Sequence, residues 1–165
     1  MQYIKGMQFY QNDKKTAITL GKFDGLHRGH ETLIERVIEH QKNDGVDSVV
    51  FAFDMAPLYE KIKKKKESLI TNEERAGRLF GRVDYLVECP FVEAVSKIEA
   101  ETFIKEILVK QFHAKYIVVG TDFHFGYQKK GDYHMLQQYS GEYGYEVEVI
   151  EKKCYEDREI SSTYI

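Results

Sequence analysis

Residues 16–30 read TAITLGKFDGLHRGH, and both the fold class and the chemistry expected of this chain follow from them. The first five of these residues form a short, β-branched apolar run, which is typical of a buried strand. From Glu31 to Gln41 apolar residues recur at spacings of one, three and four, which predicts an amphipathic helix. The glycines and histidines between the two therefore lie at the turn from a strand into a helix N-terminus.

This turn has the composition of a phosphate-binding site. Gly29 and His30 fall at the helix N-terminus, where unpaired backbone N–H groups and the helix dipole favour an anion. His27 and His30 are three residues apart and can direct ring N–H donors at one phosphate, which suits charge developing on a phosphoryl oxygen. The alternative interpretation is that the two histidines at this helix start are caps or surface residues. A zinc site would need more ligands than the two histidines, and Cys89 and Cys154 do not supply them because they are isolated in the sequence.

The rest of the chain predicts one doubly wound α/β domain over residues 1–165. Strands are expected near 16–20, 47–53, 83–88, 115–119 and 145–150, and helices near 30–42, 72–81, 100–112 and 132–140. This alternation indicates a Rossmann-like parallel sheet of about five strands, with ligands at the carboxyl ends of the strands. The loops after the first and fourth strands are expected to flank the point where the strand order reverses.

The composition predicts a cytoplasmic domain with a substantial core. The chain has 165 residues, of which 42% are hydrophobic, and its formal net charge of −3 gives no indication of nucleic-acid binding. No secretory signal or apolar run of transmembrane length is present, so no membrane partner is expected. Two cysteines far apart in the sequence suit a reducing compartment.

Two further segments carry polar side chains where a ligand is expected. Residues 120–132 follow the fourth expected strand and alternate aromatic with polar side chains between glycines. These aromatics either stack on a flat heterocycle or pack on the domain. Ser161, Ser162 and Thr163 precede the first turn of another helix, where hydroxyls and free N–H groups favour the outer phosphates of a triphosphate or simply cap the helix.

Together the three segments resemble the adenylyltransferase module of the bacterial FAD synthetase family, in the nucleotidylyltransferase superfamily. The matching residues are GxFDGxHxGH at 21–30, VGxDFxFG at 119–126 with Gly131 and Asp132 after it, and ISSTxI at 160–165. The resemblance spans nearly the whole chain. Cytidylyltransferases share the first segment, whereas the second and third segments distinguish the flavin branch.

The resemblance implies transfer of AMP from ATP to FMN, giving FAD and pyrophosphate, with Mg²⁺ bridging the substrate phosphates and no metal ligands on the protein. The phosphate of FMN is already an anionic nucleophile, so no covalent enzyme intermediate is needed. The implied site residues are His27 and His30 for charge stabilisation; Gly21, Lys22, Phe23, Asp24, Gly25, Gly29, Gly120, Ser161, Ser162 and Thr163 for the nucleotide; and Asp122, Phe123, Phe125 and Tyr127 for the flavin.

Departures from the family pattern keep alternatives open. The family usually shows Pro-His-Pro after the second strand, where this chain reads FDMAP at 53–57, and its final motif continues with a phosphate-binding arginine past Ile165. The chain is therefore expected to be a fragment, without the riboflavin kinase module that is often fused to the family. The alternatives are a cytidylyltransferase-type enzyme acting on a small phosphorylated alcohol, and a catalytically weak nucleotide- or flavin-binding module.

Overall fold

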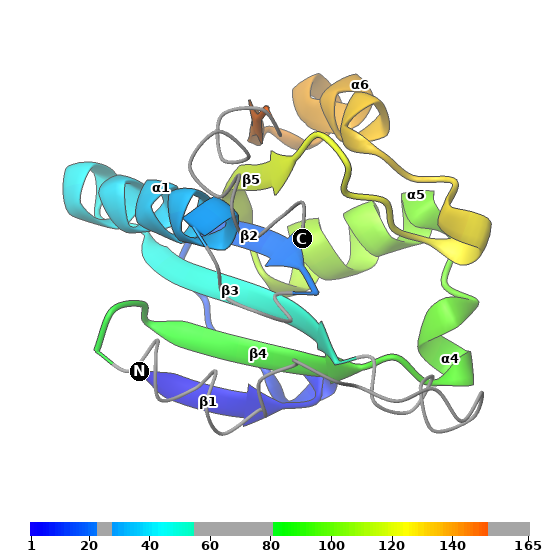
Figure 1. Cartoon of the computed structure of the whole chain (residues 1–165), viewed down its shortest axis with the longest axis horizontal. Coiled ribbons are helices and arrows are strands. Elements are labelled where there is room, and N and C mark those ends of the chain that lie inside the picture. Colours follow the sequence, from blue (N-terminus) through cyan, green and yellow to red (C-terminus); the bar gives the residue numbers. More distant parts are fainter. Residues whose placement is uncertain (23–27, 55–80, 152–165) are drawn as a thin grey trace, which may run out of the picture.

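Six parallel strands form the sheet of the described chain, in the order β1-β4-β3-β2-β5-β6 (Figure 1). The computed structural model describes residues 1–22, 28–54 and 81–151, and the backbone alone for residues 28–30. The predicted doubly wound, Rossmann-like sheet is confirmed, with one strand more than expected. The strands are β1 (Gln2–Lys5), β2 (Thr16–Gly21), β3 (Asp47–Asp54), β4 (Tyr85–Pro90), β5 (Ala114–Gly120) and β6 (Glu146–Ile150).

The helices confirm three of the four that the sequence predicted. They are α1 (Arg28–Asp44), the short α4 (Glu93–Ser96), α5 (Ala100–Thr102), which continues as the π-helix η2 (Phe103–Gln111), and α6 (Tyr133–Tyr143), with single 3₁₀ turns η1 (Met7–Phe9) and η3 (Tyr127–Lys129). Residues 72–80 of the helix expected at 72–81 lie outside the described residues. Among the described helices, none combines the length and the apolar composition that a membrane span requires.

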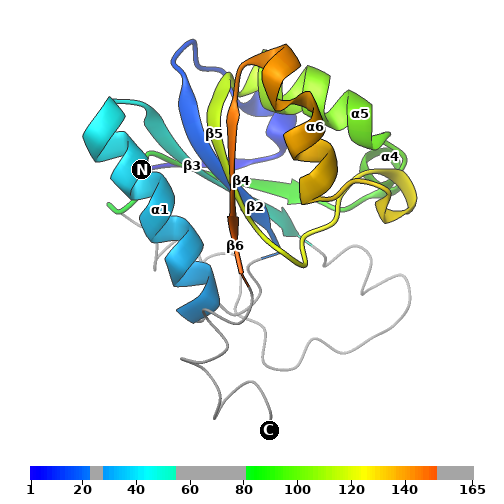
Figure 2. The same ribbon diagram turned by 90° about the horizontal axis from the view of Figure 1, so that it is seen from above.

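Helices cover both faces of the sheet. Figure 2 shows α1 on one side of the strands and α5 and α6 on the other. Because side chains alternate along a strand, neighbouring residues enter different cores. Ala17 packs under Leu33, Ile34 and Val37 of α1, whereas Ile18 belongs to the core formed with η2 and α6.

The ends of α6 are set by its own sequence. The Asp132 side chain accepts a hydrogen bond from the Met135 N–H at 3.1 Å, which satisfies one of the donors left free in the first turn. This bond is the largest cause of a lowered pKa at Asp132. Gly144 ends the helix with φ +76°, a left-handed conformation that glycine adopts without steric cost. The chain then turns directly into β6.

Candidate functional site

The strand order reverses between β2 and β5, and an open parallel sheet binds ligands at such a point. β3 and β4 lie on one side of β2, while β5 and β6 lie on the other. The register pairs Thr19 of β2 with Val118 of β5, so the two strands end side by side at Gly21 and Gly120. The expected position of the switch point, flanked by the loops after these two strands, is confirmed.

On the face that α1 covers, the ends of the central strands carry almost no side-chain bulk. Gly21 ends β2 and pairs with Ala52 of β3. Ala17 and Val118 pack against α1, so strand alternation places positions 21 and 120 on that same face. With glycine at both positions, no Cβ stands between a ligand and the main chain there.

The first turn of α1 lies directly after this end of β2 in the chain. The helix begins at Arg28, so Gly29 and His30 belong to its first turn, as the sequence predicted. The first N–H groups of an α-helix have no partner within the helix and form the positive end of its dipole. Lys22 is exposed just past the end of β2. The remaining nominated residues on this side, His27, Phe23, Asp24, Gly25, Ser161, Ser162 and Thr163, lie outside the described residues.

A two-pronged ion pair holds the first turn of α1. Arg82, in the turn before β4, donates from Nη1 to Glu31 Oε1 at 2.9 Å and from Nη2 to Glu31 Oε2 at 2.7 Å. The hydrogen bond from Arg82 to Glu31 raises the pKa of the arginine, and the charges of Glu31 and Glu35 add to the rise. Sequence reasoning missed this contact, because its partners are 51 residues apart.

Main-chain hydrogen bonds close the loop between β5 and α6. The Phe125 N–H donates to the Gly131 carbonyl at 3.1 Å, and the Gly131 N–H donates back at 2.8 Å. The Tyr127 N–H donates to the Ile98 carbonyl at 2.8 Å, which fastens the loop to the segment before α5. Gly126 has φ +81°, and a Cβ there would lie 2.6 Å from the Cα of Ala100. The loop conformation therefore requires glycine at position 126.

The aromatic side chains of this loop divide between core and surface. Phe125 is only 4% exposed and packs on Phe103, at 5.6 Å between ring centroids. Phe123 is half-buried and lies nearly parallel to Phe125 at 5.7 Å. Tyr127 and Asp122 are exposed. Of the two interpretations left open by the sequence, packing holds for Phe125, while Phe123 and Tyr127 remain accessible.

A second network joins α1 to the edge of the sheet. Glu148 of β6 accepts two hydrogen bonds from Arg36 and one contact from His40 Nε2. The His40 ring stacks on Tyr116 at 3.8 Å between centroids, and the Tyr116 hydroxyl donates to Asp44 at 2.8 Å. Between Tyr116 and Glu148, the His40 side chain is only 12% exposed.

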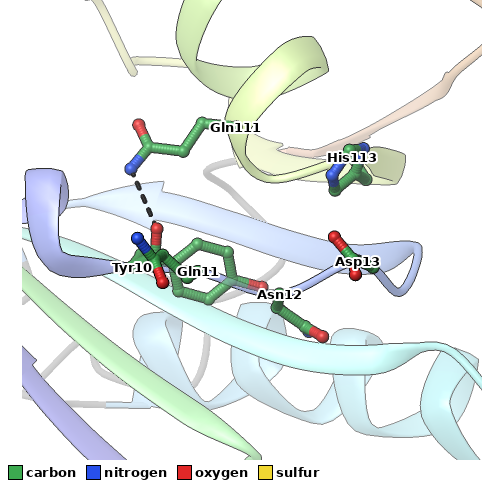
Figure 3. A pocket seen from close by; sticks show the side chains of 6 residues that line it. All are labelled: Tyr10, Gln11, Asn12, Asp13, Gln111 and His113. Atoms are coloured by element: carbon green, nitrogen blue, oxygen red, sulfur yellow. Dashed lines mark hydrogen bonds between the residues drawn. The ribbon is translucent and has the colours of Figure 1, made fainter.

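The described chain also has a polar pocket of about 410 Å³ (Figure 3). It lies beside the segments that precede β2 and β5, at the opposite end of these strands from Gly21 and Gly120. Its lining residues come from the segments that enter β2 and β5: Tyr10, Gln11, Asn12, Asp13, Gln111 and His113. The Gln111 amide donates to the main-chain carbonyl of Tyr10 at 3.3 Å, and burial raises the pKa of the Tyr10 phenol to about 12. Ligands of doubly wound folds bind at the carboxyl ends of the strands, so this pocket is not the candidate active site.

Known proteins similar to this chain include several with two named activities. Proteins named bifunctional riboflavin kinase/FMN adenylyltransferase match from Escherichia coli strain K12 (31% identity, 90% of this chain and 48% of that protein), Haemophilus influenzae (30%, 100% and 54%) and Buchnera aphidicola from Schizaphis graminum (29%, 100% and 54%). The chain thus spans about half the length of the curated relatives it matches.

Solved structures agree with the fold. A Streptococcus pneumoniae protein described as a macrolide-efflux protein aligns with a TM-score of 0.74 at 26% identity, over 92% of this chain and 50% of that one. Pantoate-beta-alanine ligase from Francisella tularensis aligns with a TM-score of 0.52 at 12% identity, over 92% and 67%, and supports the fold alone. The family model for FAD synthetase matches residues 9–164, nearly the whole sequence. The chain therefore belongs to the FAD synthetase family.

Proposed function

We propose that this chain transfers AMP from ATP to FMN, giving FAD and pyrophosphate. The observation that carries the proposal is the pair of glycine-ended strands, β2 and β5, at the switch point of the sheet, with the first turn of α1 following β2. Membership of the FAD synthetase family and relatives named FMN adenylyltransferase support AMP transfer to FMN.

In the proposed reaction, a phosphate oxygen of FMN attacks the α-phosphorus of ATP. The bond from the α-phosphorus to the oxygen that bridges to the β-phosphate breaks, and pyrophosphate leaves with that electron pair. The protein has to align the two phosphates and stabilise the charge that develops on the oxygens of the α-phosphate. We assign this stabilisation to the N–H groups at the start of α1 and to the imidazole groups of His27 and His30.

The remaining nominated residues divide between the two substrates. For the triphosphate and its nucleoside, the proposed contacts are Gly21, Lys22, Phe23, Asp24, Gly25, Gly29, Gly120, Ser161, Ser162 and Thr163. For the flavin, we assign ring contact to Phe123 and Tyr127 and a polar contact to Asp122, whose side chains are not buried, unlike that of Phe125. Phe125 is buried between Phe103 and Gly131, so we assign it the role of packing beneath Phe123 rather than of touching the flavin.

Mg²⁺ would bind together with ATP, through the phosphate oxygens, and would neutralise part of their charge. In the part of the chain that the structure describes, no group of three or more His, Cys, Asp or Glu side chains is arranged to hold a metal. We further propose a cytoplasmic location, and that the riboflavin kinase activity named for the relatives belongs to the part of their length that this chain does not match.

The test is direct. Incubation of the chain with ATP, Mg²⁺ and FMN should yield FAD, separated by chromatography and also detected as a fall in flavin fluorescence when adenine stacks on the ring. CTP in place of ATP should give no product. A folded chain that binds ATP and leaves FMN unchanged would contradict the proposal and favour a binding module, while activation of a phosphorylated alcohol by CTP would favour a cytidylyltransferase.

A further inference from the structure

The Arg82–Glu31 pair differs in placement from the helical ion pairs of the described chain. Lys97–Glu93 and Lys110–Glu106 each join neighbouring turns of one helix through exposed side chains. Arg82 instead reaches from the turn before β4 to the first turn of α1 and contacts both oxygens of one carboxylate. Both side chains are 34% exposed, so the pair is more shielded from water than either helical pair.

The negative charge of Glu31 has two opposing effects at the start of α1: it stabilises the helix and it repels a bound anion. An acidic side chain in the first turn stabilises the helix through its dipole, and Glu31 is the acidic residue there. The same charge repels an anion that binds to the N–H groups of that turn. With a rise of about 1.5 Å per residue, Glu31 lies about 5 Å along the axis from the start of α1, within the Debye length of about 8 Å at physiological salt. Solvent ions therefore screen this repulsion only partly.

We propose that Arg82 is a positioning residue for the nucleotide, which cancels the charge of Glu31 beside the triphosphate and fixes the first turn of α1. This inference rests on the proposed function, because it takes the start of α1 as the phosphate site. The charge of Glu35, one turn further along α1, also raises the pKa of Arg82, so a second carboxylate lies within electrostatic range of the guanidinium. The two-pronged geometry suits arginine, whose planar group matches a carboxylate.

The test compares Arg82→Gln, Glu31→Gln and the double variant. The measured quantity is the dissociation constant of Mg·ATP by calorimetry, at low and high salt. Arg82→Gln leaves an uncompensated carboxylate beside the phosphates and should weaken ATP binding about tenfold at low salt, and less at high salt. Glu31→Gln should leave binding unchanged or tighter, and the double variant should return to within about threefold of the original chain.

The controls separate charge from folding. Arg82→Lys keeps the charge but loses the fork, so its ATP affinity should lie between those of the original chain and Arg82→Gln. Lys110→Gln removes a cation from an exposed helical pair and should leave ATP affinity unchanged. Circular dichroism confirms that each variant is folded. If Arg82→Gln fails to fold, the proposal is still tested by the other two variants, because Arg82→Lys should weaken ATP binding whereas Glu31→Gln should not.

The outcomes also distinguish this inference from the proposed function. Equal weakening by Arg82→Gln and Glu31→Gln, or no weakening by Arg82→Gln, overturns the inference and assigns the pair to structure alone. ATP binding that follows the charge pattern while FMN stays unconverted supports the role of Arg82 and overturns only the transferase. If the original chain does not bind ATP at all, both are overturned.

Discussion

Two nitrogens of Arg36 on α1 donate to the same carboxylate oxygen of Glu148 on β6: Nε lies 2.8 Å and Nη2 lies 2.5 Å from Oε2. Burial alone would raise the pKa of Glu148, but the hydrogen bonds from Arg36 and His40 outweigh it and hold this pKa below its ordinary value of 4.5. The contact fastens the helix that carries the HxGH turn to the strand that leads into the C-terminal segment.

Acid should weaken this contact. A carboxylate whose pKa is lowered by folding stabilises the native state above its unfolded pKa, and the contribution disappears as the pH falls through the folded value. Glu148→Gln should therefore lower the free energy of unfolding by about 1–2 kcal/mol at pH 7 and flatten its fall below about pH 4.5. Urea unfolding of the original chain and of Glu148→Gln, at pH 7 and below about pH 4.5, measures both changes in the free energy of unfolding. Glu106→Gln, in an exposed helical pair, is the control and should change stability by less than about 0.5 kcal/mol. An equal effect of the two variants would count against the network.

Gly126 should tolerate no side chain. In Gly126→Ala the new Cβ would meet the backbone of Ala100 at a positive φ, so the unfolding free energy should fall by about 1–3 kcal/mol and the KM for FMN should rise. Gly141→Ala is the matched control, because it lies in α6 with open space around it. That change should raise stability by up to about 1 kcal/mol through helix propensity. Unchanged stability and FMN affinity in Gly126→Ala would contradict the conclusion that the conformation of this loop requires glycine at position 126.

Two threonines of β2 provide a paired test of buried hydroxyls. Thr16 and Thr19 are both 0% exposed. The Thr16 hydroxyl donates to the Phe112 carbonyl at 2.9 Å, whereas Thr19 Oγ1 has no hydrogen-bond partner among the described residues. Thr16→Val should lose about 1 kcal/mol of stability, and Thr19→Val should be neutral or gain up to about 1 kcal/mol. Thermal unfolding compares them, and a larger loss for Thr19→Val would show that its hydroxyl has a partner after all.

His30 is the most exacting test of the proposed chemistry. Removal of one donor to a developing oxyanion costs about 100-fold or more in turnover, so His30→Ala should show a loss of that size in kcat with FMN and ATP as substrates. A loss below about threefold would return His30 to the role of a helix cap.

The central sheet was predictable because its strands are buried, β-branched runs that alternate with amphipathic helices. The edge strand β1 was missed: Gln2–Lys5 has only four residues, no clear alternation, and a partner more than eighty residues later in the chain. The π-helical path of η2 was missed as well, because the apolar spacing of residues 103–111 fits an α-helix equally well. Local patterns carry no information about either feature.

The candidate site divides along the same line. The positions of Gly21 and Gly120 at strand ends and of Gly29 and His30 at the start of α1 were predictable, since glycine-rich turns at strand ends are a local signal. The burial of Phe125 depends on Phe103 and on the Gly131 backbone, and the contacts Glu31–Arg82 and Arg36–Glu148 join residues far apart in sequence. Long-range pairs of this kind form only when the sheet brings their elements together.

We propose that a nucleotide's phosphates bind where β2 ends and α1 begins. When ¹⁵N-labelled chain is titrated with Mg·ATP and followed by amide chemical shifts, the largest shifts should fall at Gly21, Gly29, His30 and Gly120. Shifts concentrated instead around the pocket of Tyr10, Asn12 and His113, at the other end of the sheet, would contradict this proposal.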